Sequence, residues 1–253
     1  MMNSPPNTVL VTGSNRGLGL EFVRQLASLP VSPSCIIATC RKPDNAVALK
    51  KIASKYPSVH ILKLDVTDRE NIRSVTEKVG HILEGQGLNL LLNNAGVGPG
   101  GDLYDVTEDI MMHTFKTNVV APLLVTQAFL PLLKSAAKTA DCIGLSWRKS
   151  AVVNISSRLA SIETNEDYLL GRYPYKTSKA ALNMVSKNLG VDLREDGILA
   201  VSLSPGSVRT DMGVPTAPLL PHQSVEMMLQ VISGLNEDDS GSFLNFTGEL
   251  IPW

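Results

Sequence analysis

The chain is poor in cysteine and histidine. It has three cysteines, Cys35, Cys40 and Cys142, and four histidines among 253 residues. Three cysteines without a C-x-x-C pair do not make an even disulfide framework, and the histidines show no metal-ligand spacing. We therefore predict neither a structural disulfide nor a bound metal.

The chain also lacks an excess of charge of either sign. Its 23 Lys and Arg residues balance 24 Asp and Glu residues, which gives a formal net charge of −1 at pH 7. Proteins that bind nucleic acid non-specifically need a surplus of Lys and Arg. The balance therefore argues against nucleic acid as a partner.

Targeting and membrane signals are missing as well. The opening residues, MMNSPPNTVL, have neither the basic start nor the apolar core of a secretory signal. No run of about 18 uncharged apolar residues occurs, so we predict no membrane span. The ending ELIPW carries no lipidation or peroxisomal motif. We expect a cytoplasmic protein in a reducing compartment, without a membrane partner.

Short apolar runs alternate with helix-like segments along most of the chain. Most runs are continuously apolar, which is typical of strands buried on both faces. This alternation predicts a single Rossmann-type α/β domain over residues 1–253, a doubly wound parallel sheet of about seven strands with helices on both faces. The predicted strands are Thr8–Thr12, Cys35–Thr39, Val59–Leu64, Leu88–Asn94, Ser150–Ser156, Ile198–Ser204 and Ser242–Phe246. The predicted helices are Leu18–Ala27, Asn45–Tyr56, Arg69–Leu83, Ile110–Ala136, Tyr175–Arg194 and Ser224–Leu235.

A proline-rich segment, Ser207–Gln223, breaks this alternation after a strand end. Irregular segments of more than about 12 residues are usually functional or mobile. In open α/β sheets, ligands bind outside the carboxyl ends of the strands. We predict that the segment forms a lid over a substrate; the alternative is a surface loop without function.

A glycine-rich bend follows the first predicted strand. Its glycines, Gly13, Gly17 and Gly19, have the spacing G-x-x-x-G-x-G rather than G-x-G-x-x-G. The bend leads directly into a helix, whose N-terminus offers N–H donors and a positive dipole, and glycines let a ligand approach the backbone. The bend therefore predicts a pyrophosphate site.

The motif TGSNRGLG (residues 12–19) resembles the nucleotide loop of the short-chain dehydrogenase/reductase family. The family's other motifs follow in order: LDV (64–66), NNAG (93–96), TN (117–118), NISS (154–157), YKTSK (175–179) and SPG (204–206). The resemblance covers nearly the whole chain and is closest to the Sniffer-type carbonyl reductase and C-factor-like branch. It implies an NADPH-dependent carbonyl reductase that acts on a ketone, aldehyde or quinone.

The resemblance names four catalytic residues: Asn118, Ser157, Tyr175 and Lys179. Tyr175 and Lys179 lie four apart, on one face of a helix, so we expect the ammonium to lower the pKa of the phenol toward neutrality. The resemblance implies that Tyr175 protonates a carbonyl oxygen, that Ser157 binds this oxygen and that Asn118 holds a water linked to Lys179. Tyr173 lacks a lysine four residues later, and no G-x-S-x-G motif supports a serine hydrolase.

The cofactor type depends on the end of the second strand. NAD-dependent enzymes usually place Asp or Glu there to bind the ribose, but this chain has Cys40 followed by Arg41. Together with Arg16, Arg41 suits the 2′-phosphate of NADP(H). The predicted cofactor contacts are Gly13, Asn15, Arg16, Gly17, Leu18, Gly19, Arg41, Asp65, Val66, Asn93, Ala95, Gly96, Tyr175, Lys179, Pro205, Gly206, Val208 and Thr210.

Several expectations concern specificity and assembly. The insert at residues 158–174, between Ser157 and Tyr175, is longer than in the commonest family members and should bulge near the substrate mouth. Apolar faces of Ile110–Ala136 and Tyr175–Arg194 suggest a homodimer. A cofactor-binding signalling or scaffold protein that has lost turnover is the alternative function, which the complete catalytic set disfavours.

Overall fold

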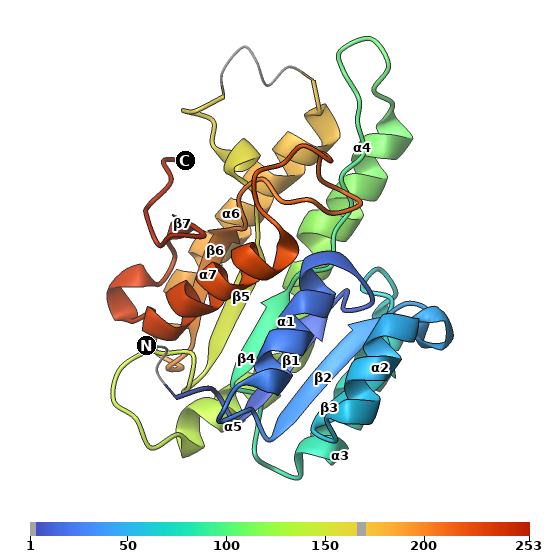
Figure 1. Cartoon of the computed structure of the whole chain (residues 1–253). Helices are drawn as coiled ribbons and strands as arrows, with labels where there is room; N and C mark the ends of the chain where they lie inside the picture. Colours follow the sequence, from blue (N-terminus) through green and yellow to red (C-terminus); the bar gives the residue numbers. More distant parts are fainter. Residues whose placement is uncertain (1–3, 166–170) are drawn as a thin grey trace.

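The computed structural model describes residues 4–165 and 171–253 of the chain. Within this part, seven strands form one sheet in the order β3-β2-β1-β4-β5-β6-β7, with every neighbouring pair parallel (Figure 1). The strands are β1 (Thr8–Thr12), β2 (Cys35–Cys40), β3 (Val59–Lys63), β4 (Leu90–Asn93), β5 (Ala151–Ile155), β6 (Leu199–Ser204) and β7 (Phe243–Asn245). The predicted doubly wound α/β fold is confirmed.

Helices cover both faces of the sheet. The α-helices of the described part are α1 (Gly17–Ser28), α2 (Val47–Lys55), α3 (Arg69–Leu83), α4 (Glu108–Phe115), α5 (Ala121–Thr139), α6 (Tyr173–Asp192) and α7 (Pro221–Gly234). Shorter helical segments are η1 (Pro43–Asn45), η2 (Lys116–Val120), η3 (Arg158–Ala160) and η5 (Glu237–Asp239). Helices α1, α2 and α7 pack on one face, and α3, α5 and α6 pack on the other (Figure 1).

Each face of the sheet has its own hydrophobic core. Successive side chains of a strand point to opposite faces, so Val9 and Val11 of β1 join the core under α1, whereas Leu10 joins the core under α3 and α5. All five residues of β1 are buried. This double burial explains why most strands read as unbroken apolar runs.

The predicted helix Ile110–Ala136 is observed as three consecutive segments. Helix α4 passes through the π-helical turn η2 into α5. The run from Glu108 to Thr139 is long and apolar enough to cross a membrane by length and composition. In this fold its α5 part packs against the sheet, with Phe129 and Leu133 fully buried in the second core.

The sheet order places a crevice between β1 and β4. Strand β1 pairs with β2 on one side and with β4 on the other, so the connections diverge in opposite directions from the carboxyl ends of β1 and β4. Ligands of doubly wound folds bind at such a point. The fold therefore brings the glycine bend after β1 next to the segment that follows β4.

Candidate active site

A pocket of about 760 Å³ opens at the carboxyl ends of the central strands. Seventeen of the predicted site residues line it: Gly13, Asn15, Arg16, Gly17, Leu18, Arg41, Asp65, Val66, Ala95, Gly96, Ser157, Tyr175, Lys179, Pro205, Gly206, Val208 and Thr210. Three others, Gly19, Asn93 and Asn118, do not line it. The sequence motifs therefore converge on one cavity.

The glycine bend forms a backbone cradle. Gly13 and Gly17 have positive φ angles of 70° and 55°, which side chains rarely allow. Gly19 lies so close to the bend that an added Cβ would come within 2.3 Å of the Gly13 carbonyl oxygen. Helix α1 begins at Gly17, and within the described structure no side chain caps it and no acidic residue occupies its first turn. Its N–H groups therefore suit a bound pyrophosphate.

Asn93 does not face the pocket. Its Nδ2 donates to the Thr126 hydroxyl at 3.1 Å and to Asn154 Oδ1 at 2.9 Å, inside the core. Asn94 lines the pocket instead, and its Nδ2 donates to the Thr12 carbonyl at 2.8 Å. Neighbouring residues of a strand point to opposite faces, so the alternation could have assigned the pocket contact to Asn94.

Tyr175 and Ser157 both line the pocket, and the Ser157 hydroxyl is near enough to favour the Tyr175 phenolate. Burial raises the pKa of Tyr175 above its usual value of 10, and the Ser157 hydrogen bond and the positive charge of Arg172 oppose this rise without cancelling it. The Nζ of Lys179 lies 5.9 Å from the Tyr175 ring centroid. The prediction of a lowered Tyr175 pKa is wrong for this structure, because desolvation of the phenol outweighs the nearby charges.

Lys179 is a buried ammonium. Its Nζ donates to the Ile155 carbonyl oxygen at 2.7 Å, at the end of β5. Burial lowers the pKa of Lys179 to about 8. At pH 7 both Tyr175 and Lys179 are therefore mainly protonated, and the site holds a proton donor beside a cation.

Asn118 lies behind the pocket, in the π-helical turn η2. Its Oδ1 accepts from the Val97 N–H at 2.9 Å, and its Nδ2 donates to the Val97 carbonyl at 2.8 Å and to the Ser178 hydroxyl at 3.0 Å. It thus ties the segment after β4 to α6, next to Lys179. Single π-helical turns inside α-helices are frequent at functional sites.

The end of the pocket beside β3 carries an ionised carboxylate. Asp65 Oδ1 accepts hydrogen bonds from the N–H and hydroxyl of Thr67, at 2.9 and 2.7 Å. Burial raises the pKa of Asp65, but these bonds and the charges of Arg41 and Lys116 outweigh burial, so the pKa lies below its ordinary value. Thr67 thus holds Oδ1 of Asp65 by two hydrogen bonds, and Asp65 lines the pocket.

The segment 207–220 runs from β6 to α7 along the pocket. An internal backbone hydrogen bond joins its two ends, since the Arg209 N–H donates to the Leu219 carbonyl oxygen at 2.9 Å. Thr210 and Met212 line the pocket, and Asp211 forms an exposed ion pair with Arg16 at 3.1 Å. The segment is three residues shorter than predicted, because α7 already begins at Pro221.

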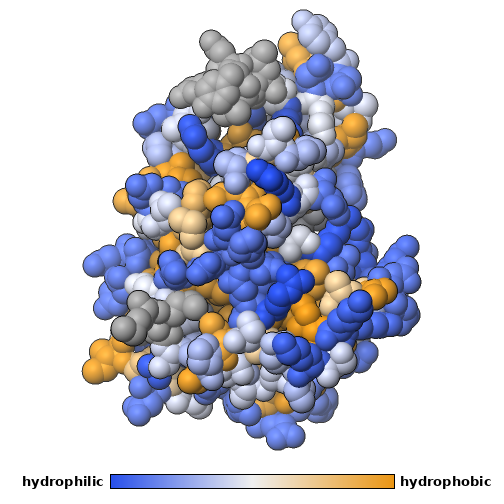
Figure 2. Space-filling view, viewed as in Figure 1, coloured by the Kyte–Doolittle hydropathy of each residue, from blue (hydrophilic) through white to orange (hydrophobic). Residues whose placement is uncertain are grey.

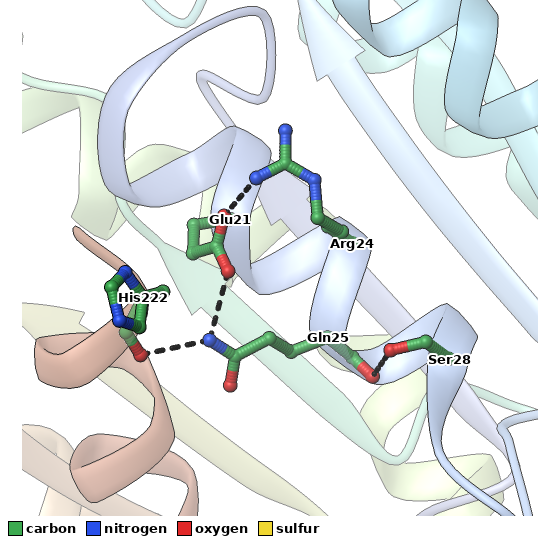
Figure 3. A network of polar contacts seen from close by, with 5 residues as sticks. All are labelled: Glu21, Arg24, Gln25, Ser28 and His222. Carbon is green, nitrogen blue, oxygen red and sulfur yellow. Dashed lines mark hydrogen bonds and ion pairs between the residues drawn. The ribbon is translucent and has the colours of Figure 1, made fainter.

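The far end of this segment is anchored to α1 (Figure 3). Gln25 Nε2 donates to Glu21 Oε1 and to the His222 carbonyl oxygen, both at 2.9 Å. The buried carboxylate of Glu21 also pairs with Arg24. The helix that starts at the glycine bend therefore holds the first turn of α7 in place.

Comparison with known proteins agrees with this geometry. Residues 7–218 match the model of the short chain dehydrogenase family. The chain belongs to this family. It is therefore related to oxidoreductases over most of its length.

Three known proteins illustrate the similarity. The carbonyl reductase Sniffer of D. melanogaster is 39% identical, with a TM-score of 0.95 over 98% of this chain and 100% of its own. An NADPH-bound carbonyl reductase from chicken fatty liver is 44% identical, with a TM-score of 0.96 over 100% of this chain and 96% of its own. The C-signal of Myxococcus xanthus is 42% identical over 167 residues, which are 66% of this chain and 93% of C-signal.

The substrate end of this short-chain dehydrogenase pocket contains residues that we did not predict. They include Val97, Arg158, Leu159, Arg172, Met212 and Phe246. Phe246 follows β7, and its ring lies 2.7 Å from where a Cβ on Gly206 would be. Arg158 and Arg172 belong to the predicted insert, whose residues 166–170 lie outside the described part. No sequence motif indicates that Phe246 lines the pocket. The two arginines lie at the ends of the insert, which we expect near the substrate mouth, so its position indicates both of them.

Metal chemistry has no visible support in this short-chain dehydrogenase. Across residues 4–165 and 171–253, no group of three or more His, Cys, Asp or Glu side chains could hold a metal ion. All three cysteines are free thiols. The described pocket offers backbone N–H groups, arginines, a tyrosine, a lysine, the Ser157 hydroxyl and the carboxylates of Asp65 and Asp211.

Proposed function

We propose that the chain is an NADPH-dependent carbonyl reductase, which converts a ketone, aldehyde or quinone into the corresponding hydroxyl compound. The observation that carries this proposal is the convergence of Ser157, Tyr175 and the buried Lys179 in the pocket that the glycine bend opens. The similarity to two carbonyl reductases over nearly the whole chain supports it.

Tyr175 is the general acid of this proposal. When bound, the nicotinamide cofactor supplies a hydride to the carbonyl carbon. The Tyr175 hydroxyl donates its proton to the carbonyl oxygen, and the Ser157 hydroxyl donates a hydrogen bond to the same oxygen. Because the pKa of Tyr175 is raised, the phenol carries its proton at neutral pH, as reduction requires.

Lys179 and Asn118 support the tyrosine. Loss of the proton leaves a phenolate, and the Lys179 ammonium stabilises this negative charge across a buried site of low dielectric. Asn118 fixes the loop after β4 and, through Ser178, the turn of α6 that carries Lys179. We propose that Asn118 also holds a water through which Tyr175 regains a proton.

The pocket fits NADP(H) at its opposite end. The cradle of Gly13 and Gly17 and the N–H groups of α1 would bind the pyrophosphate, and Asp65 would accept from the adenine amino group. Arg41 and Arg16 would bind the 2′-phosphate. Arg16 pairs with Asp211 here, so we propose that it exchanges this partner for the phosphate.

We further propose one NADP(H)-binding domain over residues 1–253, with the segment 207–220 as its lid. A homodimer through α5 and α6 is also proposed, since Leu123, Met184 and Val191 are large, apolar and exposed on these helices. Size-exclusion chromatography with light scattering would measure the molar mass and so the number of chains in the assembly. A cytoplasmic location remains part of this proposal.

A spectrophotometric assay tests the function. Purified protein is mixed with NADPH and a panel of quinones, dicarbonyls and aldehydes, and the loss of NADPH absorbance is followed. The similarity to C-signal favours a second candidate, a cofactor-binding signalling protein without turnover. NADPH binding without oxidation by any carbonyl compound would support that candidate and exclude the reductase.

A further inference from the structure

Among the residues that the structure describes, two arginines without an ion-pair partner line the substrate end of the pocket. Arg158 and Arg172 line this end, and neither forms an ion pair with another described residue. Among the described residues, the carboxylates that line the pocket are Asp65 and Asp211. Asp65 lies beside Arg41 at the end of the pocket beside β3, and Asp211 is already paired. In the described structure, Arg158 and Arg172 therefore have no free carboxylate beside them among the residues that line the pocket.

The backbone holds both arginines close to the reacting groups. Arg158 directly follows Ser157, and its N–H donates to the Ser204 hydroxyl at 2.9 Å. Arg172 directly precedes α6, and its guanidinium is near enough to Tyr175 for its charge to favour the phenolate. The two cations thus approach the Ser157–Tyr175 pair from two different segments.

Arg172 occupies an unusual backbone position. Its φ is 57°, and in the described chain Glu84 is the other non-glycine residue with positive φ. Glycine or asparagine adopts this conformation with less strain than arginine. The guanidinium is therefore placed on the pocket rim at a conformational cost, and residues held this way cluster at functional sites.

Apolar side chains line the space between the arginines and the lid. Leu159 follows Arg158, Met212 and Val214 come from the segment after β6, and Phe246 comes from the segment after β7. A ligand that fits this end therefore needs an apolar body, a group that reaches Ser157 and Tyr175, and a negative charge at the rim.

We propose that the substrate is an oxo acid, a ketone or aldehyde whose apolar body ends in a carboxylate bound by Arg158 and Arg172. The inference rests on the carbonyl reduction proposed above and specifies its substrate class. Guanidinium groups bind carboxylates through short, charge-assisted and often bidentate hydrogen bonds. The hydride and proton go to the oxo group, and the carboxylate itself is not changed.

A pair of substrates that differ only in a carboxylate tests whether the enzyme recognises the negative charge. At saturating NADPH, kcat/KM is measured for 4-oxo-4-phenylbutanoate and for its methyl ester, which keeps the ketone and the ring but removes the charge. The acid should exceed the ester by about tenfold to a hundredfold, since hydrogen bonds to charged groups contribute on this scale. The difference should lie mainly in KM, and rising salt should reduce it.

Two variants locate the effect. Arg172→Asn removes the guanidinium and introduces a residue that adopts positive φ readily, and Arg158→Gln removes the charge but keeps a polar side chain. Each variant should lower the acid-to-ester ratio of kcat/KM by about tenfold. Arg73→Gln is the matched control, because Arg73 lies on α3, outside the pocket, in an exposed pair with Glu77. Its ratio should equal that of the parent.

A binding measurement separates this inference from the proposed function. Calorimetry compares 4-phenylbutanoate, which has no ketone, with 4-phenylbutanamide on the NADP⁺-loaded protein, and the acid should bind at least tenfold more tightly. Equal kcat/KM for the acid and the ester, or a ratio unchanged in both pocket variants, would overturn the oxo-acid assignment. If no carbonyl compound oxidises NADPH, the reductase proposal fails, and equal binding of the two probes would then remove charge recognition as well.

Discussion

The cofactor end of the pocket is built from the ends of buried strands, whereas the substrate end is built from loops and from residues after the last strand. The glycine bend, Asp65 and Asn94 follow β1, β3 and β4, whose positions the two cores fix. Arg172, Met212 and Phe246 come from segments far apart in the sequence and outside the sheet. In the proposed function, the first end binds the cofactor and the second end determines which carbonyl compound is reduced.

This difference between the two ends of the pocket indicates where the sequence can change without loss of the cofactor site. A one-residue shift at the cofactor end would turn a strand side chain to the opposite face of the sheet, as the opposite directions of Asn93 and Asn94 show. Changes in the insert at 158–174 or in the segment 207–220 leave the sheet intact. Substrate range can therefore diverge while the cofactor cradle stays the same.

The largest expected effect comes from the residue at which the two ends meet. Tyr175→Phe should lower turnover by about 10²- to 10⁴-fold, the range for a positioned proton donor, while NADPH affinity changes little because the ring still packs. Steady-state rates and a fluorescence titration of NADPH measure the two quantities.

Tyr173→Phe is the matched control for this variant. Tyr173 is at the first position of α6 and does not line the pocket, so its rate should stay near that of the parent. More than about a tenth of the parent rate in Tyr175→Phe, less than the smallest loss expected for a general acid, would rule out Tyr175 as the acid.

The next effect is confined to the cofactor end. Two arginines facing the 2′-phosphate should favour NADPH over NADH by roughly 2–4 kcal/mol, or about 30- to 1,000-fold, after allowance for exposure and salt. Arg41→Asp should remove most of this preference, because it deletes a donor and adds repulsion, while NADH use holds or improves. Dissociation constants of both cofactors are measured for each protein.

Lys42→Asp controls for the change of net charge in this experiment. Lys42 is adjacent and exposed, but it does not line the pocket, so the preference should remain. Equal affinities of the parent for NADH and NADPH would show that Arg41 is an ordinary surface charge.

A smaller effect follows from the pKa of Lys179, which is about 8. The ammonium form, which stabilises the phenolate, predominates below this pH and is lost above it, whereas the raised pKa of Tyr175 keeps the phenol protonated. The reduction rate should therefore fall by about tenfold between pH 7 and pH 9. A pH profile of kcat at saturating NADPH measures it.

Lys179→Arg sharpens this prediction, since arginine stays protonated throughout the range. Whatever its absolute rate, the variant should lack the alkaline decline. A parent profile that is flat up to pH 9 would mean that Lys179 does not control the rate through its charge.

The smallest expected change is in the dynamics of the lid. Binding of NADPH should slow hydrogen exchange of the amides at 207–220 several-fold, since Thr210 and Met212 line the pocket. The amides of β2, buried in the sheet, serve as the internal reference. Identical exchange at 207–220 with and without cofactor would show that the segment is not a lid.

The sequence predicts the fold well because strands that are buried on both faces appear as continuous apolar runs. All seven strands could be located, since every residue of β1, β2, β4, β5 and β6 is buried, although in β3 only Val59 is. The π-helical turn η2 could not be predicted, because it depends on the contacts of Asn118 with Val97 and Ser178 rather than on local pattern.

The site is predictable only where a motif and a strand end coincide. The direction of the Tyr175 pKa was missed because spacing reveals the nearby lysine but not the burial of the phenol, which raises the pKa. Phe246 was missed because tertiary packing alone brings it beside Gly206. Arg16 was identified correctly as a pocket residue, but its pairing with Asp211 across 195 positions has no local signal.

The pairing of β1 with β4 also determines when the cradle can exist. The Thr12 hydroxyl accepts from the N–H of Asn94, which lies 82 positions later in the chain. At about 5–20 residues per second of protein synthesis, the first strand waits roughly 4–16 s for this partner. Until then the glycine bend has no opposite wall, so the nascent chain acquires its nucleotide site only after the fourth strand has been made.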